Sequence, residues 1–443
     1  MPDNEQPPIP DDADMPPDPF GAGDPFEVSA SDDNGTTSPT DEPFANGADP
    51  FAALGSMFGP MMGDLAKAMS AQTQNGWQQA KHYAVIRASG ESGTTQPSSP
   101  DRPVDPLERI RLEELVGIVE RHVVDFTGQE LSGPKGLTVL AHTRAGWASA
   151  FLDAHRRALE PALGLPSPPP VDSGGSPGSP EAIMSGLIAA VGPSMMAMQI
   201  GAMAGQLSHR YFGSGDLPLP RANADSVSFI PSNISRFADE WSLPIDSLRV
   251  RVAIDELVSH GIVRLPHIAS SLRTNIARHA SAFTIDADAL MERFAALGTD
   301  PAALQDQLAE ITSTAARSAT PDQRQAAAAL QRLNSIISGY VGHVGDRVGT
   351  QLLGGDRRVA EAMRRRRLQP DEATDMLASL TGLQITAEQH DRGAAFIDGV
   401  LERTGDLGAV PLQTLWTSEA NLPTESELDA PGLWLARIEL QQP

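Results

Sequence analysis

The first fifty residues place the strongest constraint on how this chain folds, because they contain 13 acidic residues, 11 prolines and no lysine or arginine. They carry −13 of a formal net charge of −24 in a chain of 443 residues. Such an acidic, proline-rich segment buries too little apolar surface to offset the entropy lost on folding. We therefore expect residues 1–50 to form a disordered acidic arm ahead of a folded part.

The acidic arm repeats one short motif, in which proline and phenylalanine follow an acidic residue. Apolar groups spaced along an acidic chain are typical of multivalent docking sites for a protein or peptide partner. The alternative is a solubilising tail in which the repeats arose by chance. The four copies end at Phe20, Phe26, Phe44 and Phe51.

Composition excludes several classes of function. The chain has no cysteine, which rules out disulfides, thiolate zinc sites, iron–sulfur clusters and a cysteine nucleophile. The strong negative charge repels phosphate backbones, so we expect no nucleic-acid partner. The N-terminal sequence has neither a basic nor an apolar signal region, so we expect a cytoplasmic location.

Apolar spacing predicts a mainly α-helical chain with minor β content. Short helices and a Ser/Pro/Gly-rich linker are expected over 51–106, and a single helical domain over 107–443. Within that domain, residues 166–180 read as a flexible insertion. Further expectations are one strand or extended edge in SVSFIPSNI, helices over about 245–261 and 281–347, and two helices followed by a loop-rich end in the tail from 371 to 443.

Residues 182–208 contain no charged side chain. An uncharged segment of this length would span a bilayer. The segment is, however, diluted by glycine, proline and glutamine and lacks flanking aromatic residues. We expect a buried helix whose small residues Gly201 and Gly205 let a neighbouring helix approach closely. A membrane-associated scaffold anchored by 182–208 is the alternative.

Seven phrases of the sequence, taken together and in order, resemble the type 2 zincin-like metallopeptidase family, a zinc-dependent hydrolase group common in actinobacteria. No phosphate-binding glycine loop, dinucleotide fingerprint or GxSxG turn competes with this resemblance. The phrases are SMFGPMMGDLAKAMS with the following NGWQQA, GQLSHRYFGSGDLPLP, FIPSNI, RVRVAIDELVSHGIVRLPHI, IISGYVGHVGDRVG, DRGAAFIDGV and LWTSEANLPTESEL.

The resemblance implies a zinc site built on an HExxH helix, whose two histidines bind the metal and whose glutamate is the general base. At the matching positions this chain has Asp255 and Ser259 in place of the histidines, and only Glu256 is retained. Ser338 stands where a glutamate is the plausible third ligand. Hydroxyl groups are poor zinc ligands, so we expect no metal or other cofactor at these positions.

A rearranged site is the alternative. Glu256 and His260 are four residues apart on one predicted helix, and His343 follows Gly339-Tyr340. These three side chains would bind zinc if the helix presented a different face. The basic run from Arg364 to Arg367 is interpreted as a solvated helix face, or as a docking site for the acidic arm.

Three functions follow from the sequence. The first is a metallopeptidase-like protein that has lost catalysis and binds a peptide or protein in the old cleft. The second is an active metal-dependent peptide hydrolase that uses Glu256, His260 and His343. The third is the membrane-associated scaffold.

Overall fold

The computed structural model describes residues 76–90, 101–159, 180–221, 225–281, 320–354, 357–367, 369, 372–405 and 409–441, and for 180–193, 195, 281, 409 and 410 the backbone alone. The chain divides into two units, Met1–Asp49 and Pro50–Pro443, and every described residue belongs to the second. The acidic arm with its four Phe repeats and residues 166–179 of the expected insertion lie outside the described residues.

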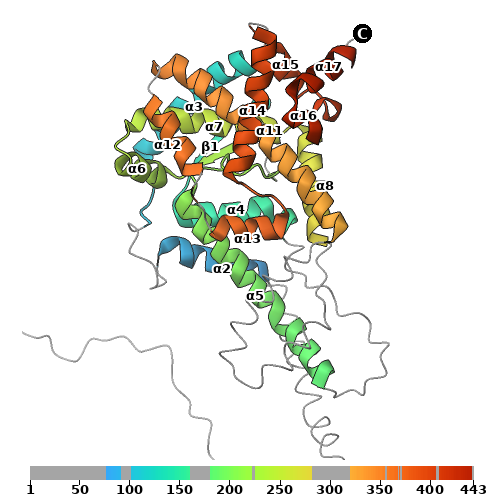
Figure 1. The fold of residues 1–443 in the computed structure, drawn as a ribbon. Helices are drawn as coiled ribbons and strands as arrows, with labels where there is room; N and C mark the ends of the chain where they lie inside the picture. The colour runs from blue at the N-terminus through green and yellow to red at the C-terminus, as the bar shows by residue number, and fades with distance from the viewer. Residues whose placement is uncertain are drawn as a thin grey trace, which may run out of the picture. The chain divides into compact units, whose positions relative to one another are not determined.

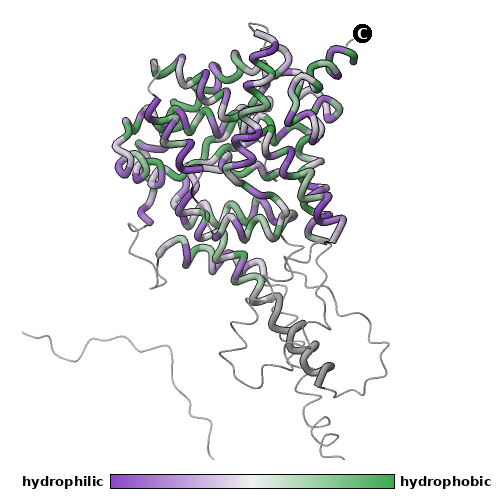
Figure 2. Tube along the Cα trace, viewed as in Figure 1, coloured by the Kyte–Doolittle hydropathy of each residue, from purple (hydrophilic) through white to green (hydrophobic). Residues whose placement is uncertain are grey.

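The described chain is mainly α-helical with a small sheet, as the sequence predicts (Figure 1). Apolar and polar residues alternate along the helices (Figure 2). The apolar residues lie on helix faces that are buried against neighbouring helices. The helices are α2 (Gly76–Ser89), α3 (Pro106–Thr127), α4 (Arg144–Leu159), α5 (Pro180–Arg210), α6 (Pro231–Glu240), α7 (Ile245–Val263), α8 (Pro266–Ser281), α11 (Pro321–Leu353), α12 (Arg357–Arg367), α13 (Glu372–Thr381), α14 (Ala387–Thr404), α15 (Ala409–Thr414), the 3-10 helix η3 (Glu419–Asn421), α16 (Glu425–Asp429) and α17 (Pro431–Gln441).

Helix α5 packs against α2 through glycines, as the small-residue pattern predicts. A Cβ atom at Gly201 would clash with the backbone carbonyl oxygen of Ala80, and one at Gly205 would lie 2.7 Å from that of Ala84. Only a residue without a side chain permits this helix–helix distance. Among the described residues, no helix is long and apolar enough to cross a membrane.

The sheet consists of two parallel strands, β1 (Thr138–Ala141) and β2 (Ser226–Phe229), paired from Thr138 with Ser226 to Ala141 with Phe229. The expected strand in SVSFIPSNI is therefore only half right, because Pro231 begins α6. Proline lacks the N–H that a ladder needs but suits the first turn of a helix, where that N–H has no partner.

The helices that carry the family's phrases form one packed group in which α11 contacts α7, α8 and α14. Gly339 of α11 and Gly393 of α14 bring these two backbones together, because a Cβ at Gly393 would clash with the Ser335 carbonyl oxygen. The expected helix over 245–261 is α7, and α11 covers the later part of the expected 281–347 helix, whose residues 282–319 are not described.

The chain's end differs from the expectation of a loop-rich tail. The segment after Trp416 contains η3, α16 and α17, and α17 packs against α14. Trp434 is fully buried there, and its indole N–H donates to the Asn421 carbonyl oxygen at 2.7 Å. Prolines and acidic residues suggested loops, but Thr424 and Glu427 form a capping box that starts a new helix.

Candidate functional site

The four residues that the sequence resemblance aligns with the family's site line one pocket of 310 Å³. Asp255, Glu256 and Ser259 come from α7, and Ser338 comes from α11, which packs against it. Glu256 and Ser259 are almost fully buried. The residue-by-residue match drawn from the sequence thus corresponds to one place in the structure.

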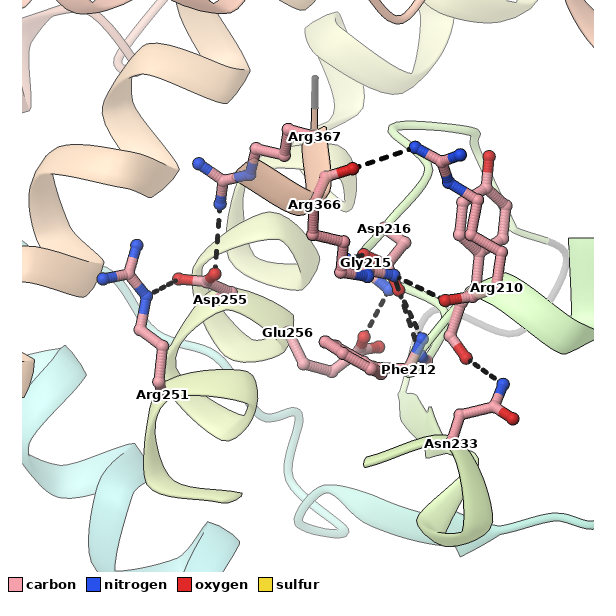
Figure 3. A network of polar contacts seen from close by, with 12 residues as sticks. Arg210, Phe212, Gly215, Asp216, Asn233, Arg251, Asp255, Glu256, Arg366 and Arg367 are labelled. Carbon is pink, nitrogen blue, oxygen red and sulfur yellow. Dashed lines mark hydrogen bonds and ion pairs between the residues drawn. The ribbon is translucent and has the colours of Figure 1, made fainter. Parts of the chain in front are cut away.

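Asp255 is held between two arginines (Figure 3). Arg251, one turn earlier on α7, places Nε 2.9 Å from one carboxylate oxygen, and Arg367 of α12 places Nη2 3.1 Å from the other. Arg251 also pairs with Asp346. Burial alone would lower the pKa of Arg251, but the two carboxylates outweigh it and raise that pKa. Burial raises the pKa of Asp255, and Arg251 and Arg367 oppose that shift.

Glu256 is bonded inward by the loop that follows α5. Its carboxylate accepts hydrogen bonds from the Ser214 hydroxyl and the Gly215 N–H, and the Arg221 guanidinium lies 3.5 Å away. Burial raises the pKa of Glu256, and these three partners oppose that shift. Figure 3 shows the Gly215 contact beneath α12.

Strand β2 fixes this loop beside α7. The Ser214 N–H donates to the Ser228 carbonyl oxygen at 3.1 Å, and the Ser228 N–H donates to Ser214 Oγ at the same distance. A Cβ at Gly215 would come within 2.8 Å of the Glu256 Cα. The loop's two glycines therefore let its backbone lie directly on the Glu256 side chain.

The two serines bring hydroxyl groups to the pocket. Ser338 Oγ donates to the Ser335 carbonyl oxygen at 3.2 Å, within its own helix. Ser259 Oγ is buried and has no hydrogen-bond partner among the described residues. Of the two hydroxyls, only that of Ser338 is thus bonded within the part of the chain that the structure describes.

The basic run on α12 is where sequence reasoning missed functional residues. Arg364 and Arg365 are exposed and pair with Glu361, as a solvated face would. Arg366 and Arg367, however, line the pocket. The helical spacing of Val359, Met363 and Arg366 was the available signal, since these three residues share one buried helix face.

Arg366, like Arg367, places a guanidinium in the wall of this pocket. It pairs with Asp216 at 2.8 and 3.1 Å, and its guanidinium lies 3.8 Å from the centre of the Phe212 ring. Burial would raise the pKa of Asp216, but Arg366 and the N–H groups of Phe212 and Gly213 outweigh it and lower that pKa. The pocket wall is thus built from ion pairs that are complete within the protein.

The structure does not bring together the three residues of the rearranged site. His260 Nε2 lies 3.0 Å from the Leu131 carbonyl oxygen, and burial and Arg221 lower the pKa of this imidazole to about 4. His343 lines a different groove of 600 Å³ between α11, α12 and α14, together with Arg347 and Asp398. Within the described ranges, no group of three or more His, Asp or Glu side chains is arranged to hold a metal ion.

Comparison with known proteins identifies the family of this chain. The model of a family described as zincin-like metallopeptidase matches residues 76–435, and the chain belongs to that family. Its fold is similar to the crystal structure of a "putative hydrolase with a novel fold" from Chloroflexus aurantiacus, at 20% sequence identity and a TM-score of 0.57. The similarity covers 82% of this chain and 98% of that one. No curated protein matches the chain.

Proposed function

We propose that this protein is a non-catalytic member of the zincin-like metallopeptidase family, which uses the former active-site pocket to bind a peptide or protein segment. The observation that carries the proposal is the Arg251–Asp255–Arg367 cluster at the first metal-ligand position. The protein's own guanidinium groups supply the positive charge that a metal ion would supply there.

The donor set of this pocket does not fit zinc. Structural and catalytic zinc sites take imidazole, thiolate or carboxylate ligands, whereas Ser259 and Ser338 offer neutral hydroxyls. Among the three positions aligned with metal ligands, the one carboxylate is Asp255, and it is already shared by two arginines. A cation entering the site would have to displace both ion pairs.

The retained glutamate is also poorly placed to act as a base. A general base needs a lone pair directed at the water or substrate whose proton it takes. Both Glu256 oxygens are engaged by the loop, one by Ser214 and the other by Gly215. These contacts support a structural role, in which Glu256 fastens the loop to α7 and pairs with Arg221.

The rest of the pocket suits a short, partly apolar segment. Tyr211, Phe212, Val252, Ile337 and Val341 provide an apolar lining. The volume of 310 Å³ is at the lower end of ligand pockets, which is room for one or two peptide side chains.

Metal content and hydrolysis test the loss of catalysis directly. The full chain, purified without a His-tag, is analysed by elemental mass spectrometry and incubated with dye-labelled denatured casein and added zinc. We expect far less than one zinc per chain and the same casein cleavage as Glu256→Gln. One zinc per chain, together with cleavage that Glu256→Gln abolishes, would overturn the proposal.

Binding is tested by panning a phage-displayed library of random 12-residue peptides on the immobilised full chain. Ser338→Trp fills the pocket, and Ser270→Trp makes the same change on the exposed face of α8. We expect enriched peptides to bind the native chain and Ser270→Trp, and not Ser338→Trp. Peptides that bind all three proteins equally, or no enrichment at all, would count against a peptide-binding pocket.

A further inference from the structure

A second pocket, of 340 Å³, lies on the other side of the loop that holds Glu256. Its walls are mainly apolar, with Leu140 from β1, Trp147 and Phe151 from α4, and Leu217 from the loop. The indole ring of Trp147 and the phenyl ring of Phe151 stack with their centroids 5.1 Å apart, which gives the pocket a flat aromatic side. The family's site residues Asp255, Ser259 and Ser338 do not line it.

Arg221 is the notable side chain of this apolar pocket. Its side chain is only 8% exposed, and its Nη1 donates to the Ser226 carbonyl oxygen at 3.1 Å. Nε and Nη2 are buried and have no hydrogen-bond partner among the described residues, and the nearest carboxylate oxygen, of Glu256, lies 3.5 Å from Nη2. These two nitrogens form one edge of the guanidinium, the edge that binds a carboxylate through two parallel hydrogen bonds.

The side chains next to Arg221 are neutral or already paired, so a ligand in this pocket would meet the charge of the Arg221 guanidinium. His142 and His155 also line the pocket, and burial lowers the pKa of both, that of His155 to about 3, so both are neutral at pH 7. Asp153 is half-exposed and pairs with Lys81 at 2.7 Å. His142 Nε2 is buried and has no hydrogen-bond partner in the described part of the chain, so it offers a second polar contact.

Glu256 does not use up the charge of Arg221. Its oxygen lies 3.5 Å from Nη2, and the same carboxylate accepts hydrogen bonds from Ser214 and Gly215. One guanidinium in this structure already accommodates two carboxylates, since Arg251 pairs with both Asp255 and Asp346. Arg221 is therefore able to hold Glu256 and a second carboxylate.

We propose that this second pocket binds the carboxylate group of a small, largely apolar acid, with Arg221 gripping the carboxylate and Trp147 and Phe151 covering the apolar body. A buried donor without an acceptor is unfavourable, so an acceptor that fills both positions is favoured. A carboxylate fills them better than a neutral carbonyl, because it presents two oxygens and the opposite charge. The proposal is independent of whether the first pocket is catalytic.

Benzoate and its neutral counterpart benzamide are suitable probes for this pocket. Binding of each to the full chain is measured by isothermal titration calorimetry and by the shift in melting temperature. We expect benzoate to bind and to stabilise the protein, and benzamide to bind at least about tenfold more weakly because it carries no charge.

Two substitutions and their controls assign the binding to Arg221. Arg221→Lys keeps a cation beside Glu256 but loses the two-nitrogen edge, so we expect at least about a tenfold loss of benzoate affinity. Arg264→Lys is the matched control, because Arg264 bonds to the Glu130 carbonyl oxygen and does not line the pocket. Ala154→Phe fills the pocket from α4 without touching Arg221's charge and should also abolish binding.

Clear outcomes overturn the proposal. Equal binding of benzoate and benzamide would show that charge is not recognised. Unchanged benzoate affinity in folded Arg221→Lys and Ala154→Phe would place the acid elsewhere. If benzoate, phenylacetate and butyrate all failed to bind the folded native chain at millimolar concentration, the pocket would not be a carboxylate site.

Discussion

Arg367 Nη2 lies 3.1 Å from the carboxylate of Asp255, at the position where the family's first zinc-binding histidine is expected. The two residues are far apart in the sequence and come from α12 and α7. Asp255 would be an uncompensated buried charge without this contact and that of Arg251. Asp255 and the two arginines that surround it therefore form one local arrangement.

Restoring the family's ligands should restore metal binding. We expect Asp255→His, Ser259→His and Ser338→Glu, combined with Arg367→Ala to remove the unpaired cation, to raise zinc content to about one per chain. The reason is that all three positions already face one pocket. Elemental mass spectrometry of the dialysed protein measures the zinc content, and a variant with alanine at the same four positions is the control. Equal zinc in both variants would mean that these positions do not form a ligand set.

Glu256 should matter for stability, in contrast to a residue that serves catalysis alone. Glu256→Ala leaves Arg221 buried without its carboxylate, and we expect the free energy of unfolding in urea to fall by about 3–5 kcal/mol. Glu256→Gln keeps hydrogen-bonding atoms and should cost less, about 1–3 kcal/mol. Glu240→Gln, at a half-exposed helix pair, is the control and should change stability by under about 0.5 kcal/mol. A native-like stability of Glu256→Ala would contradict the structural role.

The free energy of unfolding should fall in acid because the buried side chain of His155 resists protonation in the folded chain. Burial, and then the charge of Arg221, lower the pKa of His155 to about 3, although its contact with the Pro220 carbonyl oxygen opposes this. The unfolded chain, with a histidine pKa of about 6.5, therefore binds a proton that the folded chain does not. This contribution to stability is complete above pH 6.5 and is lost as pH falls towards 3.

His155→Phe isolates that contribution. Relative to the native chain, its free energy of unfolding should rise by about 2–3 kcal/mol between pH 7 and pH 4.5, because phenylalanine takes no proton. Urea unfolding at a series of pH values measures the difference, and His82→Phe, at an exposed position of α2, is the control. Parallel pH profiles of His155→Phe and the native chain would refute the assignment.

Two glycines should respond to alanine in opposite directions. Gly201→Ala adds a Cβ that clashes with the Ala80 carbonyl oxygen, and we expect a loss of about 1–3 kcal/mol. Gly117→Ala adds a Cβ on α3 with nothing within 4 Å, and should stabilise the protein by about 0.5–1 kcal/mol. Thermal and urea unfolding compare the two. A gain of stability in Gly201→Ala would mean that α2 and α5 do not pack as described.

Sequence reasoning was most reliable where the pattern is local. Helical periodicity predicted the mainly α fold and the helix from Ile245, and the spacing of Gly201 and Gly205 predicted a close helix neighbour. It was wrong for the end of the chain, because the capping box at Thr424 outweighed a composition typical of loops. The four residues singled out by the match of short phrases to a family, Asp255, Glu256, Ser259 and Ser338, line one pocket in the structure.

The sequence by itself determined the helical class of the fold, the family and the types of donor at the site, since residue identity decides whether a side chain is able to bind zinc. Only the tertiary structure decided what surrounds those donors. Arg366 and Arg367 look like a solvated basic run, and Arg221 carries no local signal at all. Their roles depend on burial and on distances between segments far apart in the chain, which no local pattern encodes.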